Sequence, residues 1–246
     1  MKMVLRKKSS KDPRALSFLL LSLVLLFAVY SCYHHLTKEN PYGLDIVSDI
    51  PSYHGQVALD SSNAMVNVAT LIPGVVLDIR YATKNNFTHK RLYESPEAFV
   101  RKPVGEALVK IQKELNAKGL GLKIYDAYRP YGVTLKFYEV YPDTVFVAQP
   151  WKGSRHNRGC AVDVSLVDLR SGKELEMPTK FDDFTEKASQ SYMALPAQVL
   201  LNKQTLKDVM VKYGFIPLQD EWWHYDFHGW EKFDLLDISF RELKKI

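Results

Sequence analysis

The sequence predicts a single α+β domain, with a central antiparallel sheet flanked by helices, behind an N-terminal signal or membrane anchor. The chain has 246 residues, of which 46% are hydrophobic and 25% are charged, and this suits one good-sized globular domain with a clear core. Helical and extended patterns follow one another without the regular alternation that indicates a parallel sheet. A basic and then apolar stretch opens the chain.

That opening stretch, residues 1–32, has the pattern of an export signal. Basic residues cluster before a mostly apolar run from Ala15 to Tyr30, as in the first two regions of a signal peptide. A small residue followed by Cys32 resembles a bacterial lipoprotein cleavage site, which would leave Cys32 lipidated. The alternative is an uncleaved anchor, because about 19 apolar residues just span a bilayer. In both cases we expect an exported domain, attached to the membrane on its periplasmic side.

The charge of the chain does not indicate a nucleic-acid partner. The formal net charge is +5, but six basic residues and one acid lie within the first 14 positions, and the remainder carries 27 basic and 27 acidic residues. A neutral domain has no global attraction for a polyanion. With Cys32 lipidated or in the membrane, Cys160 has no partner, so the domain must rely on its core or on a metal. The sequence does not indicate an oligomeric state.

The first elements can be assigned from local patterns. Residues 33–62 are polar with scattered Pro and Gly, which indicates a linker or lead-in and places the folded domain at 63–246. Residues 66–81 suggest two extended pieces around a Pro-Gly turn. Ser-Pro-Glu at 95–97 suggests a helix start, and apolar residues at helical spacing predict a second helix over 103–119.

The second half of the chain is expected to form most of the sheet. Residues 160–166 alternate, with apolar side chains on one face and Asp163 on the other, which predicts a half-buried strand. Cys160 then lies on the apolar face, as a buried residue rather than a ligand. The other expected elements are a strand at 120–125, a short helix at 130–141, an amphipathic helix at 196–213, a short extended piece at 215–217 and a strand at 222–227.

Two short segments offer the side chains of a catalytic zinc site. His156 and Asp163 belong to the first, and His224 belongs to the second. Imidazole and carboxylate suit zinc, and three protein ligands leave a position open for water. Gly159 favours a turn that would bring His156 back towards Asp163. Glu221, in the turn before the last strand, would be the general base for that water, with an ordinary solvated glutamate as the alternative.

Two further residues remain open to more than one interpretation. Arg129 follows a strand end, where a guanidinium could stabilise an oxyanion or bind a carboxylate. From spacing alone, a structural salt bridge to Asp126 is favoured. His228 follows His224 by four residues and could be mistaken for a ligand, although it and the remaining histidines are expected to face solvent.

Five separated segments together resemble the D-alanyl-D-alanine dipeptidases, which belong to the zinc D,D-peptidases that share a fold with the sonic hedgehog signalling domain. The resemblance covers roughly residues 66–230, and its motifs stand in the order of that family. The segments are Asp78–Thr88, Tyr125–Pro130, Ser154–Asp163, Met177–Asp182 and Glu221–Tyr225.

The resemblance implies one Zn²⁺ per chain and hydrolysis of the D-alanyl-D-alanine dipeptide to two D-alanines, in cell-wall peptide turnover or glycopeptide resistance. It implies zinc ligation by His156, Asp163 and His224, with Glu221 as catalytic base and Arg129 stabilising the tetrahedral intermediate. Four residues would line the dipeptide pocket, Asp182 and Ser154 near the substrate ammonium: Tyr81, Tyr93, Ser154 and Asp182.

Two alternatives remain. A D,D-carboxypeptidase or murein peptidase of the same fold would act on longer stem peptides, and Asp182, as an anchor for a free ammonium, favours the dipeptidase. A non-catalytic zinc-binding module is disfavoured by the intact set of ligands, base and arginine. The expected partners are therefore the dipeptide substrate and, through the N-terminus, a membrane.

Overall fold

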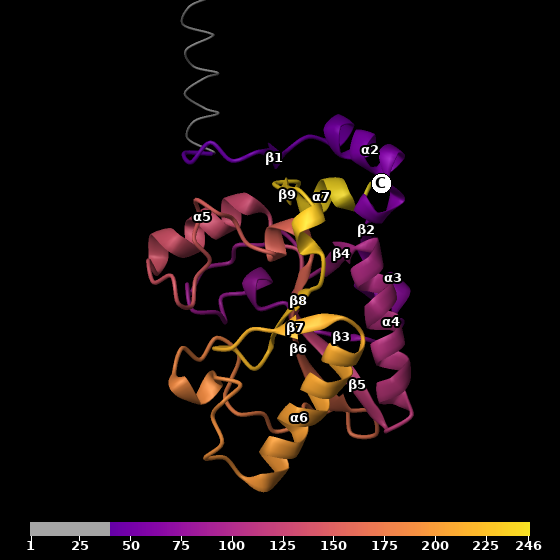
Figure 1. The fold of residues 1–246 in the computed structure, drawn as a ribbon, viewed down its shortest axis with the longest axis vertical. Coiled ribbons are helices and arrows are strands. Elements are labelled where there is room, and N and C mark those ends of the chain that lie inside the picture. Colours follow the sequence, from indigo (N-terminus) through magenta and orange to yellow (C-terminus); the bar gives the residue numbers. More distant parts are fainter. Residues whose placement is uncertain (1–39) are drawn as a thin grey trace, which may run out of the picture. The chain divides into compact units, whose positions relative to one another are not determined.

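The computed structural model describes residues 40–246, so the predicted signal or anchor lies outside the described residues. Residues 45–246 form one compact unit, which contains the sheet and the helices described below (Figure 1). Within residues 40–246 no helix is both long and apolar enough to cross a membrane.

A five-stranded sheet forms the centre of this unit, in the order β3-β5-β6-β8-β7. β3 runs parallel to β5, and the other neighbours are antiparallel. The predicted antiparallel sheet is therefore correct except at the β3 edge. The strands are β3 (Val76–Leu77), β5 (Leu120–Asp126), β6 (Ala161–Asp168), β8 (His224–Phe227) and β7 (Phe215–Pro217).

Two long helices cover one side of the sheet and contact each other, while α5 lies on the other side (Figure 1). They are α4 (Lys102–Asn116) and α6 (Ala197–Lys212), and α5 is Tyr131–Val140. Cys160, just before β6, and the alternate β6 residues Val162, Val164 and Leu166 belong to the main hydrophobic core. These helices and strands lie where the sequence placed them, because each combines a clear periodicity with a start or stop signal.

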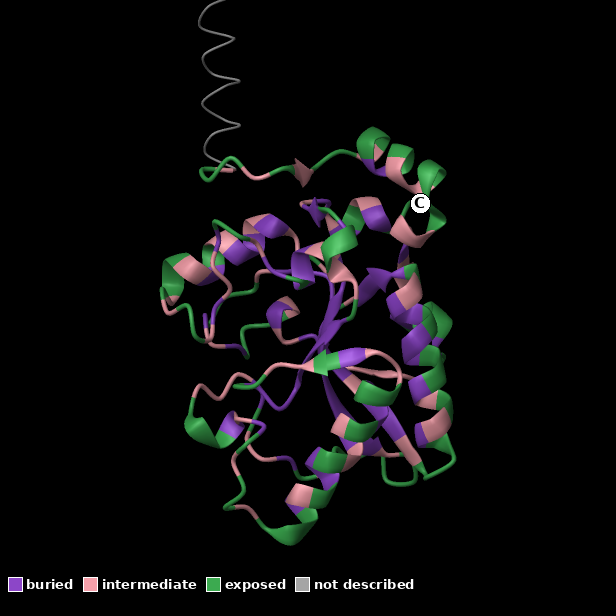
Figure 2. Ribbon diagram, viewed as in Figure 1, coloured by how far each residue is buried: buried purple, intermediate pink, exposed green. Residues whose placement is uncertain are grey.

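Strand β6 is more buried than the predicted half-buried strand. Asp163 is 2% exposed and Ser165 is fully buried, and Figure 2 shows the central strands buried along their length. β6 is the middle strand of its sheet, and loops containing Tyr81 and Asp182 cover the face opposite the helices. The Asp163 carboxylate is therefore largely removed from water, which makes a positive partner necessary.

One predicted helix is absent. Ser95 to Ala98 contain no regular element, and β4 (Phe99–Arg101) follows and pairs antiparallel with β2 (Met65–Asn67). Phe99 and Val100 are buried in this pairing, so packing prevails over the local Ser-Pro helix signal.

The predicted lead-in is folded over most of its described length. β1 (Ile46–Val47) pairs with β9 (Leu235–Leu236). Helix α2 (Ile50–Leu59) starts at Asp49, whose side chain accepts a hydrogen bond from the Ser52 amide. The Tyr53 side chain of α2 is buried, and its hydroxyl accepts a hydrogen bond from the Met65 amide at 2.7 Å. The Asp-x-Pro start of α2 is a helix signal that the polar composition of the segment obscured.

The remaining short elements connect these layers. Two are α-helical, α3 (Val68–Leu71) and α7 (Phe240–Leu243), and α7 begins with a capping box between Ser239 and Glu242. The others are 3₁₀ turns at Ser61–Asn63, Arg80–Ala82, His156–Arg158, Glu186–Ala188 and Trp230–Lys232.

Candidate metal centre and active site

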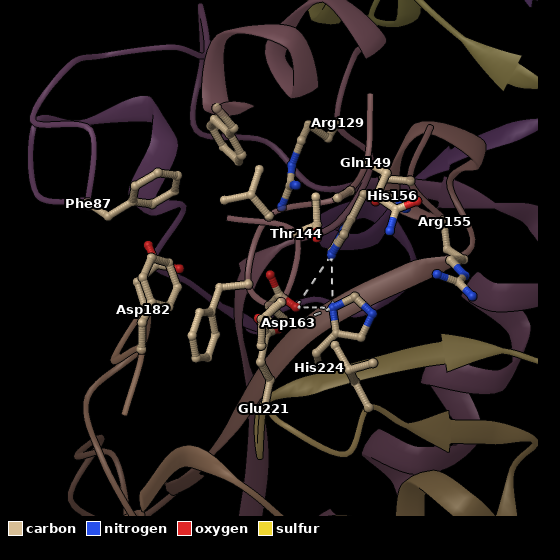
Figure 3. Close-up of a pocket in the computed structure, with 18 of the residues that line it drawn as sticks. Phe87, Arg129, Thr144, Gln149, Arg155, His156, Asp163, Asp182, Glu221 and His224 are labelled. Carbon is tan, nitrogen blue, oxygen red and sulfur yellow. Dashed lines mark hydrogen bonds and ion pairs between the residues drawn. The ribbon is translucent and has the colours of Figure 1, made fainter. Parts of the chain in front are cut away.

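Three side-chain atoms converge at the centre of the sheet face opposite α4 and α6. His156 Nε2 lies 3.2 Å from His224 Nδ1 and 3.4 Å from Asp163 Oδ1, and His224 Nδ1 lies 3.0 Å from the same carboxylate oxygen (Figure 3). Ligands about 2.0 to 2.1 Å from one tetrahedral zinc ion lie roughly 3.3 Å from one another. The donor types and the separations therefore fit a single Zn²⁺.

The backbone explains this convergence. Asp163 of β6 and His224 of β8 are direct cross-strand partners, so sheet register alone places them side by side. His156 opens the 3₁₀ turn before β6, and Gly159 ends this turn with a φ of 69°. The positive φ favours glycine here, and a side chain on Gly159 would in addition press on the Met65 methyl at 2.8 Å and approach the Arg101 backbone nitrogen at 3.3 Å. The predicted turn that returns His156 to Asp163 is present.

The second nitrogen of each imidazole makes a hydrogen bond outside the cluster. His156 Nδ1 donates to the Ala127 carbonyl at 2.6 Å, and His224 Nε2 donates to Asp226 Oδ1 at 2.9 Å. These bonds require protons on the outer nitrogens and leave lone pairs facing the cluster, as metal-ligating histidines need. Asp226 was missed from the sequence. Its position two residues after His224 in a strand, hence on the same face, was the available signal.

Glu221 lies in the turn before β8, as predicted, and points at the cluster. Its Oε2 is 3.7 Å from His224 Nδ1, and the residue is only 7% exposed. Burial raises the pKa of the Glu221 carboxyl to about 8, against the opposing effect of the nearby His224. The interpretation as a solvated surface glutamate does not fit this burial.

Arg129 makes the predicted salt bridge and also faces the cavity. Its Nε and Nη2 donate to Asp126 Oδ2 at 3.1 and 2.7 Å, and its guanidinium lies 4.4 Å from the centre of the Phe137 ring. The Tyr93 hydroxyl donates to the other oxygen of Asp126 at 2.7 Å. Asp126 is fully buried, so the arginine is held rigidly at the cavity wall.

A cavity of about 300 Å³ opens over the cluster. Of the four predicted pocket residues it is lined by Tyr81, Ser154 and Asp182, but not by Tyr93, which lies behind Asp126. The structure therefore gives Tyr93 contact with Asp126 instead of the predicted place in the pocket wall. Aromatic rings form much of the remaining wall, namely Phe87, Phe137, Phe146, Phe184 and Trp223.

Asp182 is an unusual carboxylate at one side of this cavity. The Tyr81 hydroxyl donates to it at 2.9 Å. Burial raises the pKa of Asp182 to about 7, and the Tyr81 hydrogen bond opposes this rise. Its φ of 61° lies in the left-handed region, which costs energy for a residue other than glycine and is often found at ligand-binding positions. A cationic ligand group would stabilise the ionised form.

The other described histidines and Cys160 lie outside the metal-ligand cluster. His228 is exposed, and its Nδ1 contacts the Gly214 carbonyl at 2.9 Å. His54 and His89 are exposed as expected, and the two remaining histidines precede residue 40. Cys160 is buried on the core side, where burial raises the pKa of its thiol to about 12.

The chain is similar to known peptidases over most of its length. Residues 61–242 match the Peptidase M15 family model, described as D-ala-D-ala dipeptidase. The D-alanyl-D-alanine dipeptidase of Escherichia coli K12 is 30% identical over 182 residues, which cover 74% of this chain and 94% of that protein. The enzyme of the same name from Enterococcus faecium is 28% identical over 175 residues, covering 63% and 87%. Among solved structures, VanYB in complex with D-alanine-D-alanine is 16% identical with a TM-score of 0.35, covering 66% of this chain and 88% of that one.

Proposed function

The chain belongs to the D-alanyl-D-alanine dipeptidase family, and we propose that it is a zinc metallopeptidase that hydrolyses D-alanyl-D-alanine to two D-alanines. The observation that carries this proposal is the placement of Glu221 3.7 Å from one of three converging zinc-donor atoms. The same cavity holds Asp182, a partly buried acid suited to a free ammonium group. Ligands, base and ammonium site are thus present together.

Each group of residues in the site has a separate role in the proposed reaction. A zinc ion held by His156, Asp163 and His224 would supply a Lewis acid that polarises the scissile carbonyl and acidifies a water molecule. Glu221 is placed to accept the water proton and then to deliver it to the leaving amine. Arg129, fixed by Asp126, faces the cavity where negative charge develops on the carbonyl oxygen.

Substrate binding follows from the charges of the cavity. Asp182 accepts the substrate ammonium, with the Tyr81 hydroxyl holding the carboxylate in place. Ser154 lines the same cavity, next to the turn that carries His156. We assign Ser154 to substrate binding as well. Tyr93 supports the site indirectly, by fixing Asp126.

The test compares the release of D-alanine from two substrates by the full-length protein purified in detergent. D-alanyl-D-alanine and a pentapeptide ending in D-Ala-D-Ala are incubated with and without a zinc chelator. Chelator-sensitive release from the dipeptide alone is the expected result. Release from the pentapeptide would instead indicate a carboxypeptidase.

The Glu221→Ala variant tests the assignment of the base. Turnover of the dipeptide should disappear, because among residues 40–246 no other carboxylate lies beside His224 Nδ1 to take the proton, apart from the ligand Asp163. The zinc content should stay near one per chain, since Glu221 is not one of the three ligands. Retained turnover would exclude Glu221 as the base, and zinc bound by the wild type without hydrolysis would indicate a binding module.

We also propose that the enzyme is exported and attached to the membrane through residues 1–32. The support is the basic and apolar pattern of that segment. An exported dipeptidase would salvage dipeptide released from the cell wall, whereas a cytoplasmic one would destroy newly made dipeptide. Labelled palmitate should be incorporated by the wild type but not by Cys32→Ser if the segment is a lipoprotein signal, and by neither if it is an uncleaved anchor.

A further inference from the structure

We propose that Arg155 binds the terminal carboxylate of the substrate and thereby selects peptides with a free C-terminus one residue beyond the cleaved bond. This proposal rests on the dipeptidase function and names a specificity residue for it. Arg155 stands between Ser154 and the ligand His156 and lines the same cavity.

The charges of the cavity are arranged with opposite signs on its two sides. Figure 3 shows Asp182 and Arg155 on opposite sides of the His156–Asp163–His224 cluster. A dipeptide carries an ammonium at one end, a carboxylate at the other and the amide between them. With its ammonium at Asp182 and its amide at the cluster, the carboxylate of the dipeptide faces the side of Arg155.

The other cations of the cavity are less suited to this task. Arg129 is already bound to Asp126 through two nitrogens. Lys152 also lines the cavity and, like Arg155, is exposed. Its ammonium on a flexible stem is a less specific partner for a carboxylate than a planar guanidinium.

The Arg155 guanidinium is held in place by its neighbours, but its hydrogen-bond donors are not all used. It lies 4.6 Å from the centre of the Trp230 ring, and its Nε is 3.5 Å from Asp226 Oδ2. Within residues 40–246 its two terminal nitrogens have no hydrogen-bond partner, and the side chain is 46% exposed. Stacking on an aromatic ring holds the plane of the guanidinium while its terminal N–H groups remain free to bind a carboxylate in bidentate fashion.

The experiment compares two substrates that differ only in this carboxylate. Full-length wild type and Arg155→Ala are assayed with D-alanyl-D-alanine and with D-alanyl-D-alaninamide, whose terminus is neutral. The variant should lose roughly ten- to a hundredfold in kcat/KM for the acid, the range of a charge-assisted hydrogen bond. Its kcat/KM for the amide should stay within about twofold of the wild type, because the amide lacks the charge that Arg155 pairs with.

Arg158 provides a matched control, because its guanidinium also lies near the Trp230 ring. The Arg158 guanidinium lies 5.4 Å from the centre of the Trp230 ring, yet Arg158 does not line the cavity. Arg158→Ala removes the same charge from the same ring and should leave the ratio of acid to amide turnover unchanged. Zinc content is measured for every variant, because Arg155 neighbours Asp226 and through it His224.

Three results would overturn the proposal. Equal losses for acid and amide would mean that Arg155 acts only through Asp226 and the metal ligand. No loss for either, or an acid-specific loss in Lys152→Ala instead, would assign the carboxylate to another residue.

Binding without turnover separates this proposal from the dipeptidase function. Calorimetry on zinc-loaded Glu221→Gln should show that Arg155→Ala weakens binding of the acid but not of the amide. Absence of D-alanine release from either substrate by the wild type would refute the dipeptidase function, while this binding comparison would still decide the role of Arg155.

Discussion

Asp226 is predicted to control zinc affinity without touching the metal. Its Oδ1 accepts the 2.9 Å hydrogen bond from His224 Nε2, and the residue is only 8% exposed. Burial alone would raise the pKa of Asp226, but the adjacent His224 keeps it below the usual value, so the group is ionised at neutral pH. A buried carboxylate in this position fixes the tautomer and orientation of the ligand and increases its basicity.

The magnitude follows from what each substitution removes. Asp226→Asn keeps an oxygen that can accept the hydrogen bond but loses the charge, so we expect a loss near tenfold in zinc affinity, about 1.4 kcal/mol. Asp226→Ala removes both and should approach a hundredfold, about 2.7 kcal/mol. The arginine at 3.5 Å, Arg155, cannot replace the acceptor because it has only donors.

The assay is competition for zinc against a chromogenic chelator at pH 7.5, with the unfolding curve of each variant as a check of folding. Asp220→Asn is the control, since Asp220 is exposed in the turn beside Glu221 and its substitution removes one charge without a contact to His224. Zinc affinity of Asp226→Ala within twofold of the wild type would refute the reasoning, because it would show that His224 is oriented by other contacts.

Two further predictions concern charge and packing around the site. Burial raises the pKa of Asp182 to about 7, so the ionised carboxylate that we propose as the ammonium site is present above that pH. KM should therefore rise as pH falls through 7, and Asp182→Asn should abolish this dependence. The Arg101 guanidinium, fully buried, donates to the carbonyls of Asn63, Arg158 and Asp234. Arg101→Leu removes these three donors and leaves the Arg158 carbonyl only a 3.5 Å contact with the Cys160 thiol. It should cost about 3 kcal/mol or more in urea unfolding, whereas an unchanged midpoint would mean that water replaces the guanidinium.

The elements that carry the site were predictable because local and global signals agree there. The alternation of residues 160–166, Gly159 and the turn before His224 each correspond to a feature of the structure. Tyr93 was expected in the pocket wall, and the structure shows it buried with its hydroxyl on Asp126, a contact that the sequence pattern does not contain. The helix expected at Ser95 failed because its neighbours pair with a strand 34 residues earlier, Val100 with Val66, which no local signal contains.

The negative charge of the cavity explains why this site favours a bound metal ion. Asp163, Glu221 and Asp182 face one cavity, where Asp163 and Glu221 are buried and Asp182 is partly buried. Arg129, a buried arginine of its wall, is already paired with Asp126. Three carboxylates that share a site repel one another, and either protonation or a bound cation must reduce this repulsion.

Protonation is favoured in the metal-free site, because burial raises the pKa of Glu221 and of Asp182. A divalent ion on Asp163 would reduce the repulsion instead, and it would leave Glu221 ionised, as a general base needs to be. The same negative charge that makes the apo site costly therefore favours the metal-bound, catalytically competent state.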